Sequence, residues 1–219
     1  MSSPAPLVIT IDGPAASGKS SIAREVARAL GFVYVNTGNM YRGMTWAVLQ
    51  AGIDPADAEA VAAFAPQAGL SCPVAEGRTQ LHWQGRALTD EELNSDPVNR
   101  AVSHIARVEA VRTALVDAQR GLAALGGLVM EGRDIGSVVF PDSPYKFYID
   151  ASEAVRAARR SAQGHADQVA ERDRLDSTRK TSPLVIPEGA RVIDNSTITL
   201  QEAVDQVLAA LRAAGLVAA

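Results

Sequence analysis

Two patterns of apolar and polar positions alternate along most of this chain. Short apolar runs rich in β-branched residues predict strands that are buried on both faces of a parallel sheet. These runs occupy residues 7–11, 32–35, 128–130, 146–149 and 191–193. Apolar residues at helical spacing predict helices over residues 20–30, 152–163 and 200–214, and Gly31 ends the first of them. This order of elements favours a parallel sheet covered by helices.

The middle of the chain departs from this alternation. Residues 54–67 predict an alanine-rich helix with Pro55 at its first helical position. Residues 69–88 form short alternating runs separated by AEG and QG, which predict small antiparallel strands, and residues 97–121 are predicted to be helical. We therefore expect an α/β fold in which residues 62–108 form a subdomain inserted into the parallel-sheet core.

Composition and charge narrow the class of protein. A chain of 219 residues is expected to form one domain, residues 1–219, and its net charge of -4 gives no general reason to bind nucleic acid or an anionic membrane. No apolar run is long enough to cross a bilayer, and MSSPAPL lacks the pattern of a signal peptide, so a cytoplasmic protein is expected. Cys72 is the single cysteine and the three histidines are scattered, which argues against structural zinc.

The stretch GPAASGKS matches the pattern G-x-x-x-x-G-K-[ST] between a predicted strand and a predicted helix. Glycines let backbone N–H groups close around phosphates, and the helix N-terminus adds partial positive charge. Lys19 is expected to reach the β- and γ-phosphates of a nucleotide, and the Ser20 hydroxyl to ligate Mg²⁺. The residues expected to bind the nucleotide are Gly13, Pro14, Ala15, Ala16, Ser17, Gly18, Lys19, Ser20 and Ser21. The loop alone does not distinguish a kinase from an ATPase or a GTPase switch.

A second stretch, NTGNMYR at residues 36–42, follows the second predicted strand. The carboxyl ends of strands are where ligands of open α/β sheets bind, so Thr37 and Arg42 are candidates for binding a substrate. Alternatively, the stretch is an ordinary helix cap in which Thr37 or Asn39 satisfies backbone N–H groups and Arg42 is solvated. The motif alone leaves both interpretations open.

A third stretch, EGRDIG at residues 131–136, directly follows the strand predicted at residues 128–130. Glu131 is placed to organise Mg²⁺ or its waters, and Arg133 to pair with a phosphate. The alternative is that Arg133 and Asp134 form a surface salt bridge of little consequence.

A fourth segment, RDRLDSTR at residues 172–179, mixes charges of both signs. Arg172, Asp176 and Arg179 have the spacing i, i+4, i+7, which places them on one helical face. A basic face that closes over two phosphoanions would exclude water and screen their repulsion, whereas the alternative is a solvated helix. We assign a short lid to residues 160–180.

The side chains in these motifs bear on the identity of the phosphoryl acceptor. A kinase that acts on an alcohol needs a base for the hydroxyl proton, whereas a phosphate acceptor needs only positioning and charge neutralisation. The motifs contain arginines and no histidine, which favours a phosphate acceptor, although Asp134 stays open as a base.

Taken together, the motifs resemble those of the bacterial cytidylate kinases, within the nucleoside monophosphate kinase family. The matching stretches run in order from about residue 7 to residue 210: ITIDGPAASGKSS, NTGNMYR, SHIARVEAVR, EGRDIGSVVFPD, ERDRLDSTRKTSPL and VIDNSTITLQEAV. The resemblance implies a P-loop kinase core, with residues 62–108 as an acceptor-binding insertion that carries the small antiparallel sheet. The acceptor motif begins with Asn36, where the family usually has an aspartate.

The resemblance also implies an activity and a set of site residues. The activity is the Mg²⁺-requiring transfer of the γ-phosphoryl group of ATP to CMP or dCMP. Residue by residue, it implies that Arg42 and Arg133 hold the acceptor α-phosphate, that Ser103, Arg112 and Asp134 read the cytosine, that Asp176 takes a sugar hydroxyl, and that Arg172 and Arg179 act on the phosphates. With Lys19, the four arginines Arg42, Arg133, Arg172 and Arg179 are the candidate catalytic residues.

Two other functions stay open at this point. One is a kinase for another acceptor, such as UMP, AMP or a hydroxyl compound. The other is a nucleotide-dependent switch, which should carry a guanine motif of the N-K-x-D type that is not found in the sequence. The resemblance further implies a monomer that acts on small-molecule substrates, CMP and dCMP. From the net charge we expect no nucleic-acid or membrane partner.

Overall fold

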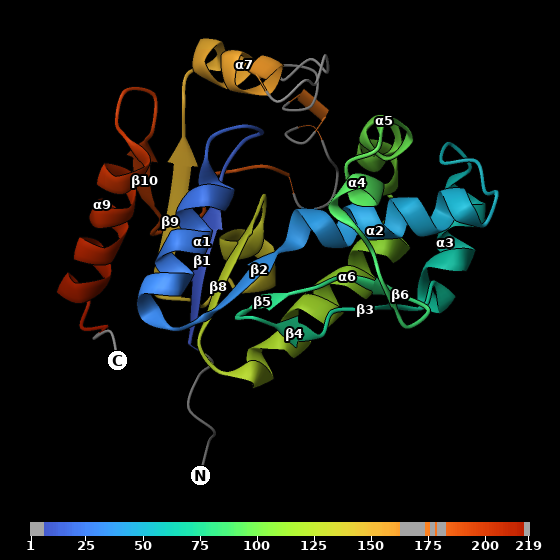
Figure 1. Ribbon diagram of the computed structural model, residues 1–219, viewed down its shortest axis with the longest axis horizontal. Helices are drawn as coiled ribbons and strands as arrows, with labels where there is room; N and C mark the ends of the chain where they lie inside the picture. The colour runs from blue at the N-terminus through green and yellow to red at the C-terminus, as the bar shows by residue number, and fades with distance from the viewer. Residues whose placement is uncertain (1–6, 163–173, 176–177, 179–182, 217–219) are drawn as a thin grey trace. The chain divides into compact units, whose positions relative to one another are not determined.

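The computed structural model describes residues 7–162, 174–175, 178 and 183–216 (Figure 1). The chain divides into two compact units. Unit 1 comprises Met1–Val35 and Ala123–Ala219, and unit 2 comprises Asn36–Leu122. None of the helices in the part of the chain that the structure describes has the length and apolar character that a membrane span requires.

Unit 1 is built on five neighbouring strands in the order β10-β9-β1-β8-β2. Their bounds are β1 Val8–Asp12, β2 Val33–Asn36, β8 Leu128–Gly132, β9 Tyr145–Asp150 and β10 Arg191–Asp194. Strand β1 pairs in parallel with β8 and β9, and β9 pairs in parallel with β10. Every residue of β1 is buried, as expected of the central strand of a sheet covered on both faces.

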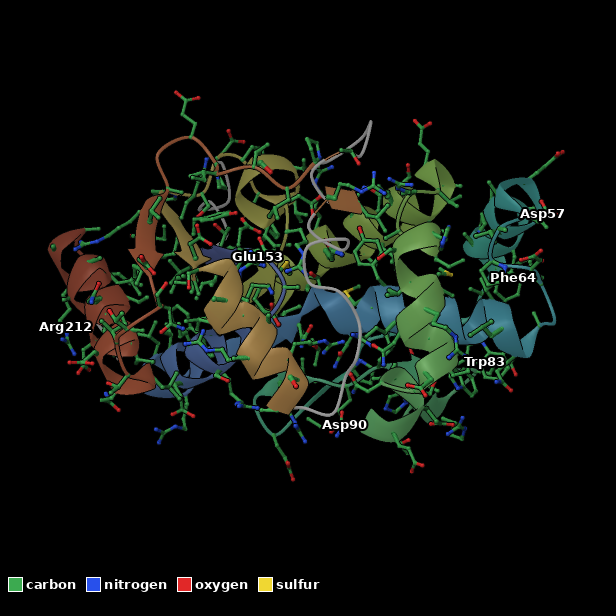
Figure 2. All side chains as sticks on the ribbon, turned by 90° about the horizontal axis from the view of Figure 1, so that it is seen from above. Asp57, Phe64, Trp83, Asp90, Glu153 and Arg212 are labelled. Atoms are coloured by element: carbon green, nitrogen blue, oxygen red, sulfur yellow. The ribbon has the colours of Figure 1, made fainter. Side chains whose placement is uncertain are left out.

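The helical elements of unit 1 include two ends that have a clear local cause. Their bounds are α1 Lys19–Leu30, the π-helical turn η3 Ile135–Val139, α7 Glu153–Ala162 and α9 Leu200–Ala213, with a 3₁₀ turn η2 at Leu122–Leu125. Gly31 ends α1 in the left-handed conformation, and Thr199 and Glu202 form a capping box at the start of α9. Helices α1 and α9 pack against each other and, with the sheet, enclose one apolar core (Figure 1). Figure 2 labels Glu153 on the first turn of α7 and Arg212 near the end of α9.

Unit 2 is mainly helical and has its own apolar core. Its helices are α2 Thr37–Gln50, α3 Ala58–Phe64, the 3₁₀ turn η1 Ala65–Gln67, α4 Asp90–Leu93, α5 Asp96–Ile105 and α6 Glu109–Gly121. Its short strands are β3 Leu70–Ser71, β4 Val74–Ala75, β5 Arg78–Thr79, β6 His82–Trp83 and β7 Arg86–Ala87. Strands β3, β6 and β7 form a small antiparallel sheet, and β4 pairs antiparallel with β5.

The predicted α/β class is confirmed, with a parallel sheet, covering helices and a small antiparallel sheet. Residues 62–108 lie within unit 2, and their extent as an acceptor-binding insertion stays a prediction. The lid predicted at residues 160–180 falls mostly outside the described residues, and it also stays a prediction.

Two predicted helices in the middle of the chain are wrong in their bounds. Pro55 does not begin a helix, because the Asp54 side chain accepts a hydrogen bond from the Ala56 N–H and forms a turn, and Asp57 then caps α3. Figure 2 labels Asp57 and Phe64 at the two ends of this helix. The single helix predicted over residues 97–121 is two helices, since Val108 is extended and interrupts them.

Candidate active site

The phosphate loop, residues 13–21, connects the central strand β1 to helix α1 in unit 1. A side chain at Gly13 would collide with the carbonyl oxygen of Ile149, so only glycine fits this close approach. Ala16 and Gly18 both have positive φ angles, 58° and 93°, which bend the loop before the helix begins at Lys19. The loop is therefore sharply bent, and it lies between a strand and a helix as the sequence predicted.

Several carbonyl oxygens of the phosphate loop accept hydrogen bonds from cationic side chains. The pairs are Arg133 Nη1 to Gly13 O at 2.6 Å, Lys19 Nζ to Pro14 O at 3.2 Å, and Arg156 Nη1 to Ala15 O at 3.4 Å. These donors engage the negative ends of the peptide dipoles on the loop. Together with the N-terminus of α1, they make the loop favourable for an anion.

Lys19 is buried against the loop, with 8% of its surface exposed. Its Nζ lies 3.9 Å from Oε2 of Glu131, which is itself buried on β8. The other carboxylate oxygen, Oε1, accepts a hydrogen bond from the Tyr34 hydroxyl at 3.2 Å. The structure thus brings together two residues that the sequence predicted separately, the lysine of the loop and the acid at the end of the strand at residues 128–130.

Asp12 is a buried acid at this site that the sequence analysis did not single out. Its two side-chain oxygens accept hydrogen bonds from the backbone N–H groups of Ile135 and Gly136, at 2.8 and 2.7 Å. Burial raises the pKa of Asp12 to about 7, against the two hydrogen bonds that lower it, and the neighbouring Asp134 adds to the rise. The available signal was a carboxylate directly after an apolar strand and directly before the phosphate loop.

The turn after β8 presents the pair Arg133 and Asp134. Arg133 is half-buried and bonded to the phosphate loop, and Asp134 is only 4% exposed, so the pair is not a solvated surface salt bridge. The π-helical turn η3 begins directly after Asp134, and the Asp134 carbonyl accepts hydrogen bonds from the N–H groups of Val138 and Val139. This backbone conformation holds Arg133 and Asp134, the two residues predicted to bind the acceptor nucleotide, next to the phosphate loop.

The residues around the loop fit a nucleotide with a Mg²⁺ ion. The buried Ser17 Oγ has no hydrogen-bond partner among the described residues. Within the described part of the chain there is no group of three or more His, Cys, Asp or Glu side chains that could hold a metal by themselves. Mg²⁺ that binds with a nucleotide takes only one or two protein ligands, and Ser20 is available as one of them.

Arg42 lies on helix α2 in unit 2, where it is half-buried and held by hydrogen bonds. Its Nη1 donates hydrogen bonds to the carbonyl oxygen of Leu93 at 2.9 Å and to Oδ1 of Asn99 at 2.8 Å. The cap of α2 is Asn36, whose side chain accepts from the Asn39 N–H at 3.1 Å. The helix-cap alternative is therefore wrong in its details, because neither Thr37 nor Asn39 is the cap and Arg42 is held by α4 and α5.

Arg112, on helix α6 of unit 2, is buried and held by contacts within its unit. Only 4% of it is exposed, Nη1 donates to the carbonyl oxygen of Ala106 at 3.4 Å, and the guanidinium lies 5.4 Å from the ring centroid of Tyr41. A guanidinium over an aromatic ring gains a favourable electrostatic interaction. Ser103 is half-buried on α5 and Thr37 is buried in the first turn of α2.

The predicted site residues therefore fall into three groups. Unit 1 holds residues 13–21, Arg133 and Asp134, and unit 2 holds Thr37, Arg42, Ser103 and Arg112. The predicted lid residues, Arg172, Asp176 and Arg179, lie outside the described residues. The roles assigned to all of them stay predictions.

Comparison with known proteins identifies close relatives over nearly the whole chain. The family model for cytidylate kinase matches residues 9–213. The chain is similar to the cytidylate kinase of Bdellovibrio bacteriovorus, with 44% identity over 209 residues, which cover 92% of this chain and 96% of that one. It is 45% identical over 213 residues to the cytidylate kinase of Mycolicibacterium paratuberculosis, covering 92% and 93% of the two chains. A crystal structure of a Thermus thermophilus protein is similar in fold alone, with a TM-score of 0.52 and 17% identity over 95% of this chain and 97% of the other.

Proposed function

Because the chain belongs to the cytidylate kinase family, we propose that it transfers the γ-phosphoryl group of ATP to CMP or dCMP. The products are ADP and CDP or dCDP. The observation that supports this proposal most directly is the family match over residues 9–213, which includes the phosphate loop and the stretches that carry Arg42, Arg112 and Arg133.

The donor nucleotide is assigned to the phosphate loop of unit 1. Backbone N–H groups of the loop and the N-terminus of α1 would hold the phosphates of ATP. Lys19 stabilises the charge of the transferring group, since its ammonium lies at the loop and is shielded from solvent. Mg²⁺ would be held by Ser20, with Glu131 nearby, and it supplies neutralisation of phosphate charge.

The acceptor nucleotide is assigned to two sets of residues. Arg42 and Arg133 hold its phosphate, because a guanidinium donates two parallel hydrogen bonds to phosphate oxygens. Ser103, Arg112 and Asp134 read the cytosine, whose exocyclic amine donates to a carboxylate and whose ring nitrogen and carbonyl accept from arginine. Thr37 is also assigned to bind the acceptor nucleotide. Uracil reverses the exocyclic donor, so it should fit Asp134 less well.

The chemistry requires no base and no covalent enzyme intermediate. The attacking atom is a phosphate oxygen that is already anionic, so positioning and charge neutralisation are sufficient for direct in-line transfer. The lid arginines, Arg172 and Arg179, are assigned to the same charge neutralisation, and Asp176 to a sugar hydroxyl. The enzyme is further proposed to act as a cytoplasmic monomer on small molecules, without nucleic-acid or membrane partners.

The test is a coupled assay of ADP release at fixed ATP and Mg²⁺, with CMP, dCMP, UMP, AMP and GMP as acceptors. We expect kcat/KM for CMP or dCMP to exceed that for each of the other acceptors by more than about tenfold, because a site built to hydrogen-bond one base rejects others. Equal rates with all five would refute selectivity for cytosine. No rate above the ATP-only control would refute the kinase activity.

Asp134→Ala tests how cytosine is selected. If the carboxylate accepts from the cytosine amine, the variant should lose most of the preference for CMP over UMP. Asp142→Ala is the matched control, since Asp142 is an exposed carboxylate that follows η3 in the same segment. An unchanged CMP to UMP ratio in Asp134→Ala would remove Asp134 from the specificity set.

A further inference from the structure

The carbonyl oxygen of Ser17, inside the phosphate loop, accepts hydrogen bonds from two side chains of other elements. Nδ2 of Asn195 lies 2.8 Å from it, and Nη1 of Arg159 lies 3.1 Å from it. The second guanidinium nitrogen, Nη2 of Arg159, donates to the backbone carbonyl of Asn195 at 2.8 Å. The three residues therefore close a ring of hydrogen bonds around one peptide group of the loop.

The position of Asn195 is fixed by the sheet of unit 1. Asn195 directly follows β10, is 4% exposed, and its backbone N–H donates to the carbonyl of Asp150 at the end of β9 at 2.8 Å. A Cβ atom at Gly18 would collide with Nδ2 of Asn195, so glycine at this position admits the amide. The contact joins the end of an edge strand to a loop 178 positions earlier in the sequence.

The Ser17 carbonyl matters because a peptide group is planar and, when trans, has its C=O and N–H in opposite directions. Fixing the Ser17 oxygen therefore fixes the direction of the Gly18 N–H. Gly18 has a positive φ of 93° and, as a glycine, has more backbone freedom than other residues, so this peptide would otherwise rotate readily.

We propose that Asn195 is a positioning residue for the nucleotide donor, which orients the Ser17–Gly18 peptide of the phosphate loop through its side-chain amide, with Arg159 as the second donor. The inference rests on the proposed function, because the Gly18 N–H is held for the phosphates of ATP. An amide suits this place because it donates a hydrogen bond without carrying a charge of its own. An aspartate of the same shape would place an oxygen against the Ser17 oxygen and repel it.

The test compares Asn195→Asp and Asn195→Ala with the wild-type enzyme. ATP affinity is measured by titration calorimetry, and kcat and KM are measured separately for ATP and for CMP. We expect Asn195→Asp to raise the Kd and KM for ATP about tenfold and to lower kcat, with a smaller change in Asn195→Ala. KM for CMP should change less than about twofold, which a general loss of structure would not produce. Unfolding in urea gives the fraction of folded protein for each variant.

Thr197→Ala is the matched control, because Thr197 is exposed in the same loop. Unchanged ATP affinity in a folded Asn195→Asp and Asn195→Ala would overturn the proposal. If neither variant folds, Arg159→Lys keeps Asn195 and the positive charge but loses the forked contact, and unchanged ATP affinity there would overturn it equally. Wild-type protein that binds ATP but does not phosphorylate CMP would refute the proposed function and leave the role of Asn195 to be judged by calorimetry.

Discussion

Oδ2 of Asp12 accepts a hydrogen bond of 2.7 Å from the backbone N–H of Gly136, which lies 124 positions later in the chain. Oδ1 of the same carboxylate accepts from the N–H of Ile135. One side chain at the end of β1 thus fixes the start of the turn η3. Arg133 and Asp134 directly precede this turn. Asp12 therefore supports two residues that are assigned to bind the acceptor nucleotide, although Asp12 is not itself assigned to bind it.

Asp12→Ala should therefore destabilise unit 1. The change leaves two buried N–H groups without their acceptors, and we expect a loss on the order of 3 kcal/mol in the free energy of unfolding, measured in urea. Asp194→Ala is the control, since Asp194 ends a parallel strand and accepts from the Ser196 N–H but is exposed, so it should change the free energy much less. Equal losses in the two variants would show that burial of Asp12 does not matter.

The same carboxylate predicts a dependence of stability on pH. The pKa of Asp12 is about 7 in the folded protein and 3.8 as a free group, so between these values the folded state holds a proton that the unfolded state has released. This contribution favours folding at low pH and is lost as pH rises through about 7. Relative to Asp12→Asn, the wild-type free energy of unfolding should fall from about pH 4 to about pH 7 and then level off. A parallel course of the two proteins would contradict the raised pKa.

Replacing Arg42 should affect the use of the acceptor CMP. Arg42→Ala should lower kcat/KM for CMP roughly 100-fold, because a charge-assisted, bidentate contact to phosphate contributes on the order of 3 kcal/mol. Arg42→Lys should recover only a small part of this loss, since an ammonium does not provide the planar fork. Arg100→Ala, an exposed arginine on α5, should leave kcat/KM unchanged. Near-normal activity of Arg42→Ala would remove the residue from the acceptor set.

Sequence patterns predicted the parts of this fold that depend on local physics. The buried runs became strands β1, β2, β8, β9 and β10, and the glycine pattern became a tight loop before α1. The interruption at Val108 was missed because no glycine or proline marks it. Asp12 and Asn195 were missed because their partners, Gly136 and Ser17, are distant in sequence, and no periodicity connects them. Local pattern thus located the phosphate loop, whereas its supporting contacts required the tertiary structure.

Gly43 on α2 lies where the core of unit 2 is closely packed, so replacing it tests that packing. A Cβ atom at Gly43 would overlap Cδ2 of Leu81 and contact Leu88, so Gly43→Ala should overpack this core and lower the free energy of unfolding by about 1–3 kcal/mol. Gly121→Ala is the matched control, because Gly121 also lies in a helix of unit 2 and has no atoms within 4 Å of the added Cβ. There the better helix propensity of alanine should leave stability equal or slightly higher. A neutral Gly43→Ala would show that Leu81 moves aside without cost.

Among these variants, we expect Lys19→Ala to lose the most turnover. Its ammonium lies 3.2 Å from the Pro14 carbonyl and 3.9 Å from the Glu131 carboxylate, so it is held at the phosphate loop. Lys19→Ala should lower kcat by roughly 10²- to 10³-fold, because it removes charge stabilisation that is strongest in the transition state. Lys146→Ala is the control, since Lys146 on β9 donates to the Glu188 carbonyl and is not part of the loop. Turnover close to wild type in a folded Lys19→Ala protein would contradict the assignment of the phosphate loop.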